Sequence, residues 1–525
     1  MRKLRFLTAG ESHGKGLTAI IEGVPAGLSL DEAVIAADLV RRQGGYGRGK
    51  RQQIEVDRAE ITSGVRHGRT IGSPIALVIV NRDHQNANWQ VRMATEPVDE
   101  AVEQVTLLRP GHADLVGTQK YGFDDVRPIL ERSSARETAA RVAAGAVART
   151  ILNELGVSIR SHTLSIGSVS ASVPERIDWD AVEASPVRVA DADAEVAMIE
   201  EIDQAQEALD TLGGVFEVRA SGVPMGLGSH VHWDRKLDGM LAQAVMSINA
   251  VKAVEIGSGI SSAGAVGSDV MDVILPAANW NRRPWERATN RAGGLEAGIT
   301  NGEDVVIRGF LKPISTVPRR MPTADLLTGN KTESFYERSD VAVVPAGGVV
   351  AEAMVALVLA DAALEKFGGD HIGELKRNFK SFESTVGPRE QIEQDSIESA
   401  KADAAEDDGG EAEPRRDAGE GANQNVQPLG VDVGAAEIEQ VRFLFWLQAE
   451  IPRVGTICRL GARGLIPAVP SRIDDGLEDD AEIIEDLVKA AHSDARKRLD
   501  EEMEKAMKEA TSGFGGMMPG FKMPF

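Results

Sequence analysis

A six-residue segment occurs twice in the sequence, about 200 residues apart. Residues 23–28 read GVPAGL and residues 222–227 read GVPMGL. Each copy follows an apolar, strand-like run and precedes a helical pattern, so the match extends to a strand–turn–helix context. A chance near-match of six residues is the alternative. The shared context favours duplication of one α+β unit, and no other sequence feature constrains the fold as much.

Residues 1–387 alternate apolar strands, glycine turns and helical patterns. The pattern predicts strands at residues 4–8, 74–81 and 305–311, and helices at residues 133–155 and 343–367. No G-x-G-x-x-G motif follows a strand, which favours a layered α+β fold over a Rossmann domain. The apolar stretch 349–364 contains Glu352 and Asp361, so we interpret it as a buried helix and not as a membrane span.

The composition changes at about residue 388. Residues 390–425 carry about twelve acidic residues against three basic ones and show no apolar period. Such a segment cannot bury a core, which predicts a disordered acidic linker over residues 388–435. Residues 436–525 form a separate C-terminal segment with a helical pattern from about 479 to 511. The chain is therefore predicted to consist of a large N-terminal domain (1–387), a linker (388–435) and a C-terminal segment (436–525).

Charge and cysteine content exclude several classes of protein. The formal net charge is −23, which argues against a whole-chain nucleic-acid binder. The single cysteine, Cys458, excludes a disulfide framework and a CxxC metal site, and it is typical of a cytoplasmic protein. His230 and His232 have strand spacing, but no set of carboxylates or cysteines accompanies them. We therefore predict no metal site, no targeting segment and no membrane contact.

Basic residues concentrate in one glycine-rich loop, residues 41–51, which holds five cations in eleven residues. Glycines let backbone N–H groups approach a ligand closely, and arginines such as Arg42 and Arg48 bind phosphates or carboxylates with two N–H groups. Residues 44–50 fit G-x-x-x-x-G-K. However, Arg51 stands where a P-loop needs Ser or Thr, and a helix precedes the loop. The alternatives are an anion site and a solvated basic loop.

Two histidines lie in glycine-containing turns, His13 in GESHG and His112 in RPGHAD. Histidines in such loops suit general acid–base catalysis near neutral pH, while a structural histidine bonded to backbone is the alternative for each. Ser133 and Ser134 are predicted to begin a helix, with Glu137 completing a capping box from Ser134. A serine-rich helix start beside arginines is also suited to bind an anion.

Eleven motifs occur in the same order as in chorismate synthases, and residues 1–387 resemble that family almost without a gap. They are GESHGKGLTAIIEGVPAG, RRQGGYGRGKR, RPGHADLVGTQKYGFDD, ERSSARETAARVAAGAVA, DTLGGVFEV, GVPMGLGS, MSINAVKAVEIG, TNRAGG, TNG, LKPISTVP and RSDVAVVPAGGVVAEAM. The resemblance implies helices sandwiched between antiparallel sheets, an internal duplication and a homotetramer. It also implies a 1,4-anti elimination that converts 5-enolpyruvylshikimate 3-phosphate to chorismate and phosphate. This reaction requires reduced FMN but has no net redox change.

The resemblance also implies roles for individual residues. His13 and His112 match the family's two histidines that act as acids, donating protons toward the phosphate and the flavin. Asp340 matches the residue that helps to remove the substrate proton. Arg42 and Arg48 match the arginines on the phosphate side, at the substrate or NADP position. The positions that match flavin contacts are Arg132, Ser133, Ser134, Asn249, Ala250, Ala297, Lys312, Pro313, Ile314, Ser315, Thr316 and Arg338. NADPH would enter only as an external or intrinsic reductant of the flavin.

Three positions depart from the family pattern. Ala253 and Ala297 stand where glycine is usual, and Val273 stands where an acidic residue is usual. An added methyl group near the flavin would cost at most about 1–3 kcal/mol of binding. We therefore expect the activity to survive.

The C-terminal tail gives an alternative function. Its helical part resembles the C-terminal half of the YbaB/EbfC nucleoid-associated proteins, which are dimeric DNA binders. DNA binding through the tail is thus the first alternative to the lyase. A bifunctional enzyme that also reduces FMN with NADPH is the second.

Overall fold

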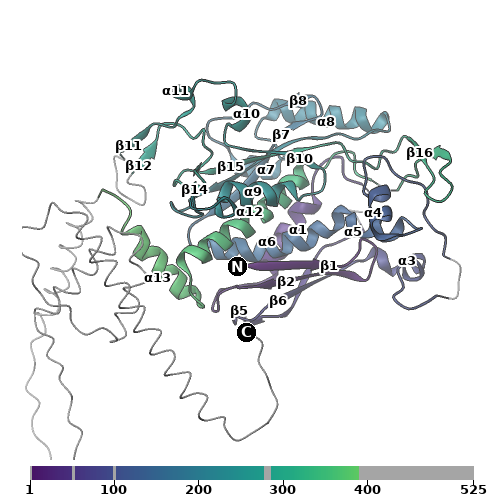
Figure 1. The fold of residues 1–525 in the computed structure, drawn as a ribbon, viewed down its shortest axis with the longest axis horizontal. Helices are drawn as coiled ribbons and strands as arrows, with labels where there is room; N and C mark the ends of the chain where they lie inside the picture. The colour runs from purple at the N-terminus through teal and green to yellow at the C-terminus, as the bar shows by residue number, and fades with distance from the viewer. Residues whose placement is uncertain (1–2, 50–53, 99–101, 277–284, 338, 389–525) are drawn as a thin grey trace, which may run out of the picture. The chain divides into compact units, whose positions relative to one another are not determined.

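The structure, a computed structural model, describes residues 3–49, 54–98, 102–276, 285–337 and 339–388. Two antiparallel sheets enclose a layer of helices (Figure 1). The first sheet has the strand order β1-β2-β6-β3, with β1 Arg5–Ala9, β2 Gly16–Glu22, β6 Ile75–Val80 and β3 Ala59–Ser63. The second has the order β10-β15-β9-β7-β8, with β10 Val251–Ile256, β15 Val305–Leu311, β9 Gly214–Ser221, β7 Ser158–Ile166 and β8 Val169–Ser170. The predicted α+β sandwich is confirmed.

The helices between the sheets are α1 Glu32–Gln43, α6 Thr138–Asn153, α9 Leu237–Met246 and α12 Val344–Phe367. The other described helices are α3 Ala87–Arg92, α4 Asp114–Tyr121, α5 Arg127–Ser133, α7 Trp179–Ala184, α8 Ala192–Glu207, α10 Gly259–Ser262, α11 Gly267–Val270, α13 Ile372–Glu383, and the 3₁₀ turns η1 Asp83–Gln85, η2 Ala135–Glu137 and η3 Trp233–Arg235. Four hairpins pair β4 Val65–Arg66 with β5 Arg69–Thr70, β11 Ile274–Pro276 with β12 Trp285–Arg287, β13 Leu295–Glu296 with β14 Ile299–Thr300, and β16 Pro322–Ala324 with β17 Lys331–Glu333.

The two halves of the domain repeat one β-β-α-β-β-α unit. The first half uses β1, β2, α1, β3, β6 and α6, and the second half uses β7, β9, α9, β10, β15 and α12. In both sheets the first and second strands of the unit pair, the second pairs with the fourth, and the fourth pairs with the third. The duplication predicted from the repeated hexapeptide therefore extends to the whole topology.

The repeated turn is held by the same hydrogen bonds in both halves. Thr70 Oγ1 donates to Pro25 O and accepts from Leu28 N, at 2.6 and 3.0 Å. Thr300 Oγ1 likewise donates to Pro224 O and accepts from Leu227 N, at 2.7 and 2.8 Å. Both threonines are buried and lie in short hairpins, β4–β5 and β13–β14. A chance match of six residues does not account for this agreement.

Helix α12 forms the centre of the helical layer. All but three of its 24 residues are buried, as expected for a helix that is apolar on every side. It is long and apolar enough to cross a membrane, but 94% of its most apolar window is buried inside the protein, so it is a core helix as predicted. It crosses α6 where Gly145 faces Ala353, and an ideal Cβ on Gly145 would lie 2.3 Å from the Ala353 Cβ.

The strands follow the alternation expected of sheets with one buried face. In β6, Ile75, Leu77 and Ile79 are buried, and the intervening residues point to the other face. The strands predicted at 4–8, 74–81 and 305–311 correspond to β1, β6 and β15. The helix predicted at 343–367 corresponds to α12.

The predicted helix at residues 133–155 was wrong at its start. Ser134 has extended backbone (φ −63°, ψ 142°), which separates α5 from the turn η2, and α6 begins only at Thr138. Ser134 does cap η2, by accepting from Arg136 N at 3.3 Å, but the Glu137 side chain binds Arg141 instead of closing a capping box. The predicted linker beyond Pro388 and the tail lie outside the described residues.

Candidate active site

A cavity of about 640 Å³ lies where the two halves meet, which is within the ~300–1,000 Å³ typical of small-molecule sites. Its walls come in equivalent pairs from the repeated unit. The loops after α1 and after α9 contribute Arg48 and Asn249, and the connections after β6 and after β15 contribute His112 and Lys312. The segments before α6 and before α12 also line the cavity, with residues 133–136 and 339–340.

The cavity carries an excess of positive charge. Its cationic lining residues are Arg42, Arg48, Arg109, Arg136 and Lys312, against the carboxylates Glu55, Glu337 and Asp340. Burial lowers the pKa of Arg42 to about 10, opposed by the charge of Asp57, so the guanidinium stays protonated at neutral pH. Arg48 Nε is buried and has no hydrogen-bond partner, while the buried Arg136 Nη2 makes no hydrogen bond and lies 3.5 Å from Glu55 Oε2. An unpaired donor such as Arg48 Nε beside a cavity is suited to bind an anion.

His13 lies in the loop between β1 and β2 and is largely buried. Its Nδ1 is 2.9 Å from Glu131 Oε1, and its ring stacks on Trp89 at a centroid distance of 3.8 Å. Its Nε2 is 3.8 Å from Asp83 Oδ2. Glu131 lies on α5 and is bound by Arg127 at 3.3 Å. The loop therefore places a fixed imidazole at the cavity wall.

His112 also lines the cavity and is held in the same way. Its Nδ1 hydrogen-bonds to the buried carboxylate of Asp114, which Arg109 also binds at 2.9 Å. Burial acts to raise the pKa of Asp114, but the His112 hydrogen bond and Arg109 outweigh it and lower the pKa to about 2. Each cavity histidine thus has a carboxylate on Nδ1 and an arginine on that carboxylate.

Asp340 joins the arginine loop to the start of α12. Its Oδ1 accepts from Gly49 N at 2.5 Å, and its Oδ2 lies 3.2 Å from Arg48 Nη1. An ideal Cβ on Gly49 would lie 2.9 Å from Ser339 O, so the loop approaches this segment too closely for a side chain. The glycine-rich loop therefore brings Arg48 and Asp340 together at the cavity.

Eight of the twelve predicted flavin positions line the cavity. Its lining includes Ser133, Ser134, Asn249, Ala250, Lys312, Ile314, Ser315 and Thr316. Asn249 Nδ2 donates to Ser133 O at 3.0 Å, while its buried Oδ1 has no hydrogen-bond partner. Lys312 Nζ donates to Gly111 O at 2.7 Å, which connects the segment after β15 to the His112 loop.

Some predicted site residues lie elsewhere. Arg132 is exposed and donates to Thr8 O and Gly10 O at 2.8 and 3.1 Å, so it braces the β1–β2 loop. Pro313 and Ala297 are not among the cavity-lining residues. Ala297 lies in the β13–β14 turn in the left-handed region (φ 51°). Arg338 lies outside the described residues.

The remaining departures from the family pattern are also remote from the cavity lining. Ala253 is exposed on β10, next to a shift of strand register after Val251. Val273 is exposed as well. Neither residue lines the cavity.

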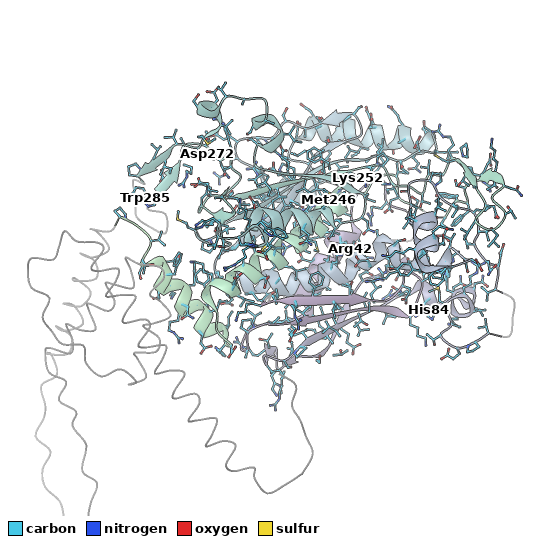
Figure 2. The ribbon with its side chains drawn as sticks, viewed as in Figure 1. Arg42, His84, Met246, Lys252, Asp272 and Trp285 are labelled. Carbon is cyan, nitrogen blue, oxygen red and sulfur yellow. The ribbon has the colours of Figure 1, made fainter. Side chains whose placement is uncertain are left out.

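Two polar segments of the sequence contain residues with structural contacts. Arg41 is not among the cavity-lining residues and binds Glu352 and Glu183 at 2.7 Å each. In the TNRAGG segment, Asp272 accepts from the backbone N–H groups of Arg291 and Ala292, both at 2.9 Å, so the segment is a braced turn. Figure 2 shows Asp272 at the outer end of the domain, well separated from Arg42.

The sequence did not single out several residues of the site. The sequence analysis missed three residues that contact the cavity histidines: Glu131, Asp114 and Trp89. Asp114 follows His112 by two residues, and Glu131 precedes Arg132 in a recognised motif, so proximity to a named residue was an available signal. Trp89 gave none, because its stacking on His13 depends on how the connection between β6 and α6 folds.

Comparison with known proteins identifies the family. The family model for chorismate synthase matches residues 4–364. Chorismate synthase from Streptomyces avermitilis is 52% identical over 393 residues, covering 73% of this chain and 98% of the relative. That from Moorella thermoacetica is 54% identical over 383 residues, covering 72% and 98%. A crystal structure of chorismate synthase aligns with a TM-score of 0.59 and 43% identity, over 74% of this chain and 99% of the other. The chain therefore belongs to the chorismate synthase family, and it is a lyase that converts 5-enolpyruvylshikimate 3-phosphate to chorismate and phosphate.

Proposed function

We propose that the cavity described above is the site of this elimination and that it holds the substrate beside reduced FMN. The observation that carries the proposal is the convergence of His13, His112, Asp340 and the arginines on one cavity between the two halves. The substrate carries a phosphate and two carboxylates. A wall with five cations against three carboxylates is suited to bind such a molecule.

The arginines on the α1 side are proposed to bind the phosphate. Arg42 is fixed by Thr138 Oγ1 and Ala135 O at 2.9 Å each, so its charge is presented from a rigid position. Arg48 adds an unpaired Nε. A phosphate held in this way is favoured as a leaving group, because its developing charge meets fixed cations and needs little reorganisation.

The residues on the α9 and β15 side fit a flavin. A buried, unpaired Asn249 Oδ1 can accept from a ring N–H, and Ser315 and Thr316 supply hydroxyl groups. Ala250 has φ 68°, and such strain in a non-glycine residue is often found at ligand sites. When bound, the reduced flavin supplies electrons that are recovered by the end of the reaction, so that no net oxidation occurs.

Different titratable groups of the cavity are proposed to donate and to accept protons. His13 and His112 present imidazoles that can donate a proton toward the phosphate and flavin sides. Asp340 presents a carboxylate, bound by Gly49 N and Arg48, that can accept the proton lost from the substrate. A positioned acid or base contributes about 10²–10⁴ in rate, so loss of any one group should be severe without being absolute.

Anaerobic turnover with chemically reduced FMN tests this assignment. Chorismate absorbance and phosphate release are followed together for the wild type, Asp340→Asn and Arg48→Ala. We expect Asp340→Asn to lower kcat about 10²-fold or more, and Arg48→Ala to act mainly on KM. Wild-type kinetics from both variants would place the reaction elsewhere in the protein.

Flavin binding is tested separately. Asn249→Ala should weaken FMN binding about tenfold, which is the value of one hydrogen bond of about 1–1.5 kcal/mol. Asn153→Ala, the same change at an exposed position at the end of α6, is the matched control. Equal FMN affinity in the two variants would remove Asn249 from the flavin site.

We further propose a cytoplasmic homotetramer. The outer face of the first sheet leaves Leu7, Ile20 and Val80 at 73%, 44% and 57% exposure, which is costly unless another subunit covers it. Leu7→Glu should then lower the mass measured by light scattering. A monomeric wild type would contradict this assembly. DNA binding through the tail is an alternative that rests on residues outside the described ranges. Flavin reduction by NADPH is a separate alternative, which consumption of NADPH with FMN alone would test.

A further inference from the structure

The residues around His13 fix the position of its side chain and also determine which ring nitrogen can carry a proton. Two acceptor atoms of Glu131 face it: Oε2 accepts the His13 backbone N–H at 2.7 Å, and Oε1 lies 2.9 Å from Nδ1. Trp89 covers one face of the ring with an interplanar angle of 12°. His13 is therefore held at its backbone N–H, at Nδ1 and at one face of its ring, by residues far from it in the chain.

The charges around His13 come from each element packed against it. Asp83, on η1, lies 3.8 Å from Nε2, and Glu131, on α5, lies on Nδ1. Arg127 reaches Glu131 from the same helix, and both Arg127 and Arg92 lie over the Trp89 ring at 5.3 and 5.6 Å. His84 Nδ1, also on η1, lies 2.9 Å from the His13 carbonyl oxygen. Among these described residues, the anionic groups face the imidazole directly, and Arg127 and Arg92 contact Glu131 or Trp89.

Glu131 is ionised in this setting. Its side chain is fully buried, and burial acts to raise its pKa. The hydrogen bond and charge of His13 and the charge of Arg127 outweigh burial and lower that pKa. An ionised carboxylate accepts hydrogen bonds and donates none. The hydrogen bond at Nδ1 therefore requires the proton to be on the histidine.

We propose that Glu131 is a positioning residue that keeps a proton on Nδ1 of His13. This assignment rests on the proposed role of His13 as an acid. A histidine that donates from Nε2 is left as a neutral imidazole only if its other proton stays on Nδ1. Without a partner for Nδ1–H, the ring can take the opposite tautomer, and donation from Nε2 would then produce an imidazolate.

Glu131→Gln reverses this arrangement with little change of shape. The Gln oxygen must accept the buried His13 backbone N–H, since an unpaired buried N–H costs about 1–3 kcal/mol. Its NH₂ group then faces Nδ1 and donates to it, so the proton moves to Nε2. We expect kcat to fall about 10²-fold or more with little change in KM. Glu131→Asp, which keeps the charge, should restore part of kcat.

Nitrogen chemical shifts of ¹⁵N-labelled histidine give a readout that does not depend on turnover. The His13 resonances are assigned by their loss in His13→Asn. Wild type should show a protonated Nδ1, and Glu131→Gln an unprotonated one. Glu365→Gln, which alters an exposed pair with Arg235, is the control and should match wild type in shifts and kcat.

Each outcome decides the proposal. An unprotonated Nδ1 in wild type would overturn it even if Glu131→Gln did not fold. A reversed tautomer with unchanged kcat would show that Glu131 does not act through His13 in the reaction. If the shifts behave as expected but His13→Asn is fully active, the proposed role of His13 fails while the positioning by Glu131 stands.

Discussion

Replacing Gly145 by alanine should destabilise the protein, although alanine is the better helix former. The added Cβ would lie 2.3 Å from Ala353 Cβ, 2.5 Å from its Cα and 2.9 Å from its carbonyl oxygen. Carbon atoms in contact need about 3.5 Å, so α6 and α12 would have to separate by roughly 1 Å. Trimming Ala353 to glycine would not relieve the clash, because main-chain atoms remain too close.

The magnitude follows from two opposing terms. Overpacking typically costs about 1–3 kcal/mol, and a clash with main chain at the centre of the layer belongs at the upper end. Alanine in place of a helical glycine recovers up to about 1 kcal/mol. The net loss should be about 2 kcal/mol, measured as a lower urea midpoint at unchanged m-value.

Gly239→Ala is the matched control. This glycine is exposed in α9, and no atom lies within 4 Å of its ideal Cβ. The same substitution should therefore stabilise the protein by about 0.5–1 kcal/mol. If Gly145→Ala were as stable as Gly239→Ala, the close crossing of α6 and α12 would not be the packing constraint inferred here.

Two further predictions concern local strain and pH. Ala297→Gly should raise the free energy of unfolding by about 0.5–1 kcal/mol, and the melting temperature with it, because glycine adopts the left-handed backbone (φ 51°) without strain. Part of the gain is lost because glycine has more conformational entropy in the unfolded state. A lower melting temperature would contradict this. Asp114 has a pKa of about 2, below its ordinary value of 3.8, so its contribution to stability is complete above about pH 4 and is lost as the pH falls toward 2. Urea midpoints of wild type and Asp114→Asn should therefore converge on acidification, and a constant difference between them would refute the assignment.

Sequence was informative where a local pattern determines the structure. The repeated hexapeptide predicted the duplication because its turn requires glycine: Gly23 and Gly222 have φ of 92° and 75°. His13 and His112 were found because glycine-containing loops place them beside a cavity. The pairing of His13 with Glu131 spans 118 residues, so no periodicity could show it. The start of α6 was missed because a single extended residue, Ser134, interrupts an otherwise helical pattern.

The duplicated architecture has a consequence for how such an active site could arise. A dimer of one β-β-α-β-β-α chain would carry every substitution twice, once on each side of its symmetry axis. Here the loop after α1 carries Arg48 while its counterpart after α9 carries Asn249, and the connection after β6 carries His112 while its counterpart after β15 carries Lys312. Joining the two copies in one chain freed equivalent positions to diverge. An asymmetric substrate and a flat cofactor can then share one cleft between halves that remain alike in fold.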